Sequence, residues 1–224
     1  MISGDGILNA TKGLPKSEMI FVETGSYMGN QIETALELGF SQVRSVEIAD
    51  EYYNHCRERF SKEVSSGKVK LYHGDSANLL SVMIGMTKKR IVFWLDAHCS
   101  KGKTGGDDNF NPLLNEIRTI KNSSSRNDHV IMVDDLRFVR KGLYKDNGQI
   151  LTEEALNNLI MSINPKYKFK YVDLEVRAYD ESGLTLKDSI VNIRDDITGE
   201  TKPSLLRKYF VARNDVLIAR DDWK

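Results

Sequence analysis

Residues 21–50 read FVETGSYMGNQIETALELGFSQVRSVEIAD, and this stretch decides the fold. A short apolar run ends at Glu23 and is followed by a turn over residues 25–29 that contains two glycines. A helical pattern comes next, and a second apolar run over residues 43–48 carries Glu47 near its end. The order of strand, glycine turn, helix and strand predicts a βαβ unit with two parallel strands.

The turn of this unit has the features of a nucleoside site. Glycine lets the backbone bend sharply and approach a ligand, and the start of a helix presents free N–H groups. Glu47 follows about 20 residues later, where a carboxylate can accept hydrogen bonds from both hydroxyls of a ribose. The dinucleotide fingerprint GxGxxG would need a glycine at Tyr27. The stretch therefore predicts a nucleoside-binding unit of another kind.

The middle of the chain continues the alternation of strand and helix. The run IVFWL at residues 91–95 is uninterrupted and predicts a central strand that is buried on both faces. Residues 69–72 and 130–133 predict two further strands. Helices are expected over residues 51–64, 77–86, 113–121 and 151–163. This order requires a parallel sheet with right-handed crossovers and helices on both faces.

The C-terminal part predicts additional strands. Residues 167–176 alternate between apolar and polar, as a strand does. Residues 209–212 and 216–219 are expected to form a closing hairpin around the turn at 213–215. We expect this part to complete the sheet with antiparallel pairing.

The length of 224 residues suits one α/β domain with a full core. We expect a single domain over residues 1–224. Within it, residues 1–18 form a short lead, and residues 177–205, which hold scattered charges and turn signals, form an insertion or cap.

Composition argues against several classes of partner. Lysine plus arginine equal aspartate plus glutamate at 32 each, so no net field favours nucleic acid or an anionic membrane surface. No apolar run approaches the roughly 18 residues of a membrane span, and residues 1–14 lack the pattern of a signal peptide. Cys56 and Cys99 form no CxxC motif, which fits a reducing compartment. We expect a soluble cytoplasmic protein that binds neither nucleic acid nor membrane.

Acidic residues stand at or just beyond five successive predicted strands: Glu23, Glu47, Asp75, Asp96 and the pair Asp134 and Asp135. Parallel strands bring these positions to one edge of the sheet. Clustered carboxylates repel one another and need a cation or an ammonium group to hold them together. Asp75 or Ser76 could also simply cap the helix that follows.

An acid that closes the first strand, a short glycine turn and an acid that closes the second strand resemble the S-adenosylmethionine (SAM) site of class I methyltransferases. The resemblance implies a Rossmann-like fold with a central, mostly parallel seven-stranded sheet and an antiparallel C-terminal strand. It assigns Glu23 to the methionine end of SAM, Glu47 to the ribose and Asp75 to the adenine side. The implied SAM-binding residues are Glu23, Thr24, Gly25, Ser26, Tyr27, Gly29, Glu47, Ile48, Gly74, Asp75, Ser76 and Asp96.

The last acids suggest a metal. If residues 91–95 and 130–133 form neighbouring strands about 4.8 Å apart, Asp96 can share a space with Asp134 or Asp135. Several hard oxygen ligands favour Mg²⁺, Mn²⁺ or Ca²⁺ over zinc. The segments VETGSYMG, FWLDAH and VIMVDD together resemble the metal-dependent sugar O-methyltransferases of the macrocin and novobiocin type. That resemblance implies Mg²⁺ or Mn²⁺ on Asp96, Asp134 and Asp135.

The implied chemistry is methyl transfer to a hydroxyl of a sugar or glycan. The metal would bind two adjacent hydroxyls and lower the pKa of one of them. His98 is the first candidate for the catalytic base, and Asp96 is the second. A homo-oligomer or a neighbouring glycosyltransferase domain is a further candidate partner.

Other interpretations stay open at this point. A catechol-like acceptor could chelate the same metal, and a non-catalytic nucleoside-binding domain would need no turnover. A metal-dependent hydrolase would use the acids but not Glu47. The glycine-rich segment 99–111 either closes over a substrate or is a surface loop, and Arg137 contacts either a substrate anion or the adjacent aspartates.

Overall fold

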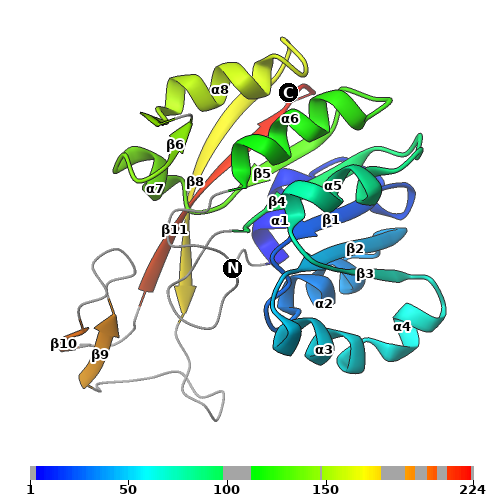
Figure 1. Cartoon of the computed structure of the whole chain (residues 1–224), viewed down its shortest axis with the longest axis horizontal. Coiled ribbons are helices and arrows are strands. Elements are labelled where there is room, and N and C mark those ends of the chain that lie inside the picture. The colour runs from blue at the N-terminus through cyan, green and yellow to red at the C-terminus, as the bar shows by residue number, and fades with distance from the viewer. Residues whose placement is uncertain are drawn as a thin grey trace.

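The computed structural model of the chain describes residues 4–97, 112–146, 148–177, 190–194, 201–205 and 211–222. Its centre is a seven-stranded sheet in the order β3-β2-β1-β4-β5-β11-β8 (Figure 1). The first five strands in this order are parallel, and β11 runs antiparallel to both of its neighbours. The predicted mixed sheet is confirmed. Its strands are β1 (Ile20–Thr24), β2 (Gln42–Glu47), β3 (Val69–His73), β4 (Ile91–Leu95), β5 (Val130–Val133), β8 (Lys168–Arg177) and β11 (Val211–Arg220).

The predicted hairpin at residues 209–219 is wrong. Residues 211–220 form one continuous strand, and the expected turn residues Arg213, Asn214 and Asp215 lie opposite β8 along its whole length. Ladder pairing with β8 through these residues outweighs the local turn preference of Asn and Asp.

Helices cover both faces of the sheet (Figure 1). One face carries α1 (Gly4–Ala10), α2 (Asn30–Glu37), α3 (Asp50–Arg59) and α4 (Ser61–Ser65), whose apolar side chains pack in one hydrophobic cluster. The other face carries α5 (Ser76–Ile84), α6 (Leu113–Ser123), α7 (Leu136–Arg140) and α8 (Glu153–Met161), which share a second cluster. The molecule therefore has three layers, with the sheet in the middle.

The helix predicted over residues 51–64 is interrupted. Phe60 leaves the helical conformation, with φ −107° and ψ 28°, and separates α3 from α4. Its side chain is buried against the sheet. The break lets an aromatic ring enter the core where a straight helix would run past it.

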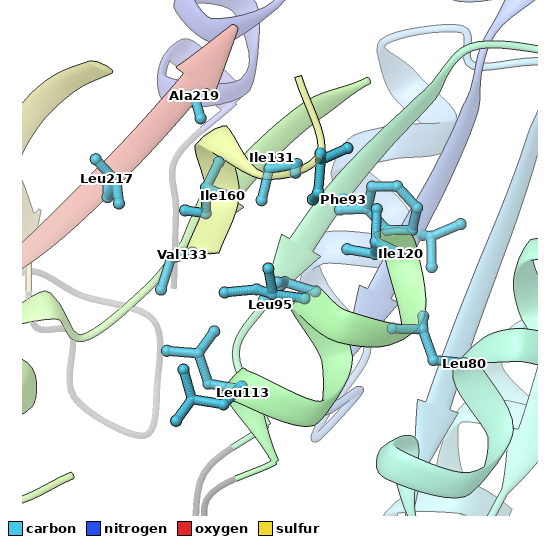
Figure 2. Packing of buried hydrophobic residues seen from close by; sticks show 14 of the residues in the cluster. Leu80, Phe93, Leu95, Leu113, Ile120, Ile131, Val133, Ile160, Leu217 and Ala219 are labelled. Carbon is cyan, nitrogen blue, oxygen red and sulfur yellow. The ribbon is translucent and has the colours of Figure 1, made fainter. Parts of the chain in front are cut away.

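Strand β4 is the centre of the core. Ile91, Phe93 and Leu95 face the α6 side, while Val92 and Trp94 face the α2 side. Figure 2 shows Phe93 and Leu95 among side chains of β5 (Ile131, Val133) and of α6 (Leu113, Ile120). All five residues of β4 are buried, as the sequence predicts for a strand covered on both faces. Trp94 is a core residue and not a surface platform.

Shorter elements complete the described chain. A 3-10 helix, η1, spans Lys16–Glu18, and β6 (Lys145–Asp146) pairs antiparallel with β7 (Gln149–Ile150). Between β8 and β11 in the chain, β9 (Ile190–Arg194) pairs with β10 (Thr201–Leu205). A cap formed by residues 177–205 stays a prediction.

Side chains cap two of the helices, and of the two cap candidates before α5 the structure selects Asp75. The Asp75 carboxylate accepts a hydrogen bond from the Ala77 N–H at 2.8 Å, and the Thr152 hydroxyl accepts one from Ala155 at 3.1 Å. In the described ranges, no helix is both long and apolar enough to cross a membrane.

His129 ties β5 to β4 from inside the core. The Ile91 N–H donates to His129 Nδ1 at 3.1 Å, so the ring proton sits on Nε2, which lies 2.5 Å from the Ser124 hydroxyl. The side chain is fully buried, and burial lowers its pKa to about 4. His129 is therefore neutral and structural at pH 7.

We expect His129 to make folding stability depend on pH. The unfolded chain takes up a proton on this residue near pH 6.5, whereas the folded protein does so only near pH 4. The contribution of His129 to the free energy of unfolding should therefore fall by up to about 3 kcal/mol as the pH drops through that window, while buried acids with raised pKa values contribute in the opposite direction. Urea unfolding at pH 7 and pH 4.5 checks this, with His129→Gln as the comparison because glutamine keeps an acceptor for Ile91. Identical pH profiles for both proteins would contradict it.

Candidate active site

The carboxyl ends of the parallel strands form one edge of the sheet. Thr24 pairs with Val46 on one side and with Leu95 on the other, and Leu95 pairs with Val133. The residues that follow these strands therefore lie at the same level. Acids from different strands are close enough here to interact electrostatically. Burial raises the pKa of Glu23 well above its usual value, and the charges of Asp96 and Glu47 raise it further.

The glycine turn is bent around internal hydrogen bonds. Gly25 has φ +87°, and the N–H groups of Gly25 and Ser26 both donate to the Val46 carbonyl, at 3.0 and 3.2 Å. A Cβ on Gly25 would lie 3.1 Å from the Asp96 carbonyl oxygen, so the turn packs directly on the end of β4. Since these two N–H groups have internal partners, the turn does not aim them at a phosphate.

Glu47 links the turn to the second strand. One carboxylate oxygen accepts the Tyr27 N–H at 2.8 Å, and the other accepts the Ala49 N–H at 2.9 Å. Tyr27 sits in the left-handed region with φ +45°, which is uncommon for a residue with a side chain. Each carboxylate oxygen can still accept a second hydrogen bond. Glu47 is thus held rigidly beside the turn, and Ile48 next to it is partly exposed.

Glu23 belongs to a buried polar chain. Ser45 donates to Glu23 Oε2 at 2.6 Å, and the hydroxyls of Ser26 and Ser45 are 2.5 Å apart. All three side chains are buried. This chain fixes Glu23 on the same face of the sheet as Glu47, where the sequence predicts the methionine end of SAM.

The third predicted segment has a mixed arrangement. The Gly74 N–H donates to the Glu47 carbonyl at 2.9 Å, so the end of β3 lies against the end of β2. The side chain of Asp75 caps α5, while Ser76 is buried and bonds to Glu116. Thr24 likewise turns its side chain toward Asp96 and Glu116. Any contact of Asp75, Ser76 and Thr24 with a cofactor stays a prediction.

Gly29 is expected to tolerate no side chain. It precedes α2 with φ +80°, and an added Cβ would lie 2.5 Å from Phe60 Cε2 and 3.1 Å from Cys56 Sγ. We expect Gly29→Ala to lower the free energy of unfolding by about 2–4 kcal/mol, through backbone strain plus overpacking. Gly39→Ala is the matched control, because Gly39 has the same φ and nothing within 4 Å of an added Cβ. Urea unfolding measures both, and equal losses would contradict the packing argument.

Beyond β5, Asp134 and Asp135 each bond to a neighbouring group of the chain. Asp135 opens α7 in the left-handed region at φ +53°, and its carboxylate pairs with Arg137 at 3.0 Å. Asp134 turns back on the chain, and its Oδ1 accepts the Asp135 N–H at 2.9 Å. Arg137 therefore contacts an adjacent aspartate, which was one of the two roles left open for it.

The predicted metal triad is not assembled in the part of the chain that the structure describes. Within those residues, no group of three or more His, Cys, Asp or Glu side chains has an arrangement that could hold a metal ion. The physical reason is the ion pair of Asp135 with Arg137, which occupies the third carboxylate. We therefore derive no catalytic step through Asp96, Asp134 and Asp135 as metal ligands.

The sequence prediction missed Glu116. This residue of α6 is 1% exposed, receives hydrogen bonds from Ser76 and Thr24, and has a pKa that burial raises to about 7. A signal was present, because Glu116 falls on the apolar stripe of its helix with Leu113, Ile117 and Ile120. An acid on a core-facing stripe indicates a buried polar site.

Glu116 lines a small cavity at the carboxyl ends of β4 and β5. The cavity measures about 10 Å³, enough for one water-sized group. Burial, together with the nearby charge of Asp96, raises the pKa of Asp134 to about 7, and burial also raises the pKa of Tyr144. The lining residues are Leu95, Asp96, Ala97, Leu113, Glu116, Val133, Asp134 and Tyr144.

Two predicted features lie outside the described residues. They are His98, the first candidate base, and the glycine-rich segment 99–111. Asp96, the second candidate base, is described: it is partly exposed, and its N–H lies 3.2 Å from the Thr24 hydroxyl.

Known proteins resemble this chain in structure rather than in sequence. No protein-family model matches it, and no curated protein does. A precorrin-6y C5,15-methyltransferase from Geobacter metallireducens shares the fold with a TM-score of 0.53 and 13% identity, over 99% of this chain and 86% of its own. The chain has the class I methyltransferase fold.

Two O-methyltransferases share this methyltransferase fold as well. One, from Bacillus cereus, was determined with S-adenosylhomocysteine (SAH) and has a TM-score of 0.52 and 11% identity, over 92% of this chain and 75% of its own. The other is a SAM-dependent O-methyltransferase from Thermotoga maritima, with a TM-score of 0.52 and 10% identity, over 99% of this chain and 65% of its own. At such low identities these neighbours establish the fold alone.

Proposed function

We propose that this chain is a SAM-dependent O-methyltransferase that acts on a hydroxyl of a polar acceptor, most readily a sugar or glycan. The observation that carries the proposal is the position of Glu47. Its carboxylate is locked against the glycine turn by two backbone N–H groups, with one acceptor site left on each oxygen. Two adjacent ribose hydroxyls match this pair of acceptors.

The glycine turn supports SAM over a phosphate-bearing nucleotide. The N–H groups of Gly25, Ser26 and Tyr27 donate to protein acceptors, so they do not cradle a pyrophosphate. SAM has no phosphates and carries an ammonium group at its methionine end. Glu23, held by Ser45 on the same face as Glu47, is an acceptor for that group.

The neighbours support methyl transfer, and two of them act as O-methyltransferases according to their names. With SAM bound, an oxygen lone pair of the acceptor would attack the methyl carbon while the bond from that carbon to sulfur breaks, and the electron pair would stay on sulfur in SAH. The hydroxyl proton passes to a base, for which Asp96 is the described candidate and His98 the alternative. Divalent metal dependence stays a prediction, and no step above requires it.

Calorimetric titration tests the cofactor. We expect SAM and SAH to bind saturably, while NAD⁺ and ATP at the same concentrations do not. Lack of heat with SAM and SAH up to millimolar concentration would contradict the proposal.

SAH release tests the reaction. A panel of sugars, amino sugars and catechol should be assayed in EDTA and in Mg²⁺ or Mn²⁺. Turnover with sugars supports the acceptor class, and turnover with catechol alone would replace it. SAM binding with no turnover on any acceptor would favour a non-catalytic domain.

A further inference from the structure

Three acidic residues line the cavity at the carboxyl ends of β4 and β5. Asp96, Glu116 and Asp134 line it, together with the Tyr144 side chain, and none of its eight lining residues is basic. Its remaining walls are apolar and come from β4, β5 and α6. Acids gathered in a space of this kind are stabilised when a cationic group lies among them.

Glu116 has an oxygen that the described protein does not satisfy. Its Oε1 is buried and has no hydrogen-bond partner among the described residues. The hydrogen bonds from Ser76 and Thr24 therefore fall on the other oxygen. Buried polar atoms nearly always have a partner, so an oxygen left open in the lining of a cavity points to a ligand that donates to it.

The size and chemistry of the cavity favour an ammonium group. A space of about 10 Å³ admits one group of the size of water, and a primary ammonium has three N–H donors for three surrounding carboxyls. The methylene that carries the ammonium would lie against Leu95, Leu113 or Val133. A metal ion fits less well, because the described residues contain no group of acids arranged to hold one.

The cavity lies on the other face of the sheet from Glu23 and Glu47, and Asp96 is the one residue of its lining that was also predicted to bind SAM. Glu23, Ser45 and Glu47 share the α2 face of the sheet through their hydrogen bonds to one another and to the turn. Glu116 lies on the opposite face, on α6, whose apolar residues pack against Leu95 and Val133. An ammonium in the cavity would therefore belong to the acceptor and not to SAM.

We propose that the Asp96, Glu116 and Asp134 cavity binds a primary ammonium group of the methyl acceptor, so that the substrate is an amino-substituted compound such as an amino sugar. The identification of the bound molecule as the methyl acceptor rests on the proposed function. The cation site itself rests only on the residues that line the cavity. The ammonium keeps its protons and its bonds, so it anchors the acceptor while a hydroxyl elsewhere on the molecule receives the methyl group.

The test measures binding of methylammonium to the full chain. Broadening of the methylammonium methyl signal in NMR spectra reports the binding, with and without SAH. We expect saturable binding at pH 8 that Glu116→Gln weakens about tenfold or more, because glutamine lacks the negative charge that Glu116 carries above its pKa. Glu37→Gln, an exposed change at the end of α2, should leave it unchanged. SAH affinity should stay within about twofold of wild type in both variants.

Several outcomes would overturn the inference. Equal broadening with methylammonium and tetramethylammonium would mean a general ionic effect, because the bulkier cation has no N–H donors and exceeds the cavity. Loss of SAH binding in Glu116→Gln would assign the cavity to SAM. Binding of Mg²⁺ or Mn²⁺ that disappears in Glu116→Gln would make it a metal site.

Failure of the proposed function is distinguishable from failure of this inference. Suppose that wild type does not bind SAH, but binds methylammonium more tightly than Glu116→Gln does. The cation site is then supported, and the methyltransferase proposal is contradicted. If SAH binds but D-glucosamine is methylated no faster than D-glucose, the proposal that the acceptor carries an amino group is contradicted. Asp134→Asn serves as a second variant if Glu116→Gln does not fold.

Discussion

Glu47→Ala is expected to weaken SAH binding by about 100-fold or more. The substitution removes two charge-assisted hydrogen bonds to the ribose, each worth about 1.5–3 kcal/mol. It also leaves the N–H groups of Tyr27 and Ala49 without their acceptor, so the glycine turn loses its support. Calorimetric titration with SAH measures the change.

Two further variants and a measurement of unfolding separate the loss of ribose hydrogen bonds from the loss of support for the glycine turn. Glu47→Gln keeps one carbonyl oxygen and should weaken binding less, by roughly tenfold. Glu37→Ala, at an exposed position, should bind SAH as wild type does. Thermal unfolding of each variant shows whether it remains folded. An unchanged affinity in folded Glu47→Ala would remove Glu47 from the cofactor site.

Glu116→Gln should stabilise the protein at alkaline pH. Between pH 4.5 and about 7 the folded protein keeps a proton on Glu116 that the unfolded chain has lost. The free energy of unfolding therefore falls as the pH rises through this window, by up to about 3 kcal/mol. Glutamine does not titrate and avoids this loss, while it can still accept from Ser76 and Thr24.

Urea unfolding at pH 4 and pH 8 checks this expectation. The variant should match wild type near pH 4 and exceed its stability at pH 8, and Glu37→Gln should show no such difference. Glu23 and Asp134 have raised pKa values too, so both proteins keep some dependence on pH. A variant that is less stable than wild type at pH 8 would contradict the burial argument. A gain in stability together with a loss of cation binding is the pattern expected of a functional site.

Only part of the candidate site could be predicted from the sequence. Glu47 could be predicted because its role depends on local spacing: a turn, a helix and the next strand bring it back beside the turn. Asp135 could not, because its partner Arg137 and its left-handed conformation follow from how α7 packs after β5. Glu116 was missed because its place on the apolar stripe of α6 was not weighed, and only the structure shows that Ser76 and Thr24 face it.

The fold shows the same division. The five parallel strands were predictable because short apolar segments alternate with helical patterns along the chain, whereas the strand order comes from the structure. The continuous β11 was not, since its pairing with β5 and β8 involves residues distant along the chain. The break at Phe60 also depends on a distant contact, with the glycine turn at Gly29.

The sequence by itself determined the alternation of strand and helix, the glycine turn and the acids at the strand ends. These are properties of neighbours along the chain, and periodicity and backbone preference are sufficient for them. Only the tertiary structure decided which acids share a space. The packing of the strand ends against α6 placed Asp96, Glu116 and Asp134 around one cavity, while Asp135 pairs with Arg137. The energy of a carboxyl group depends on what surrounds it in three dimensions.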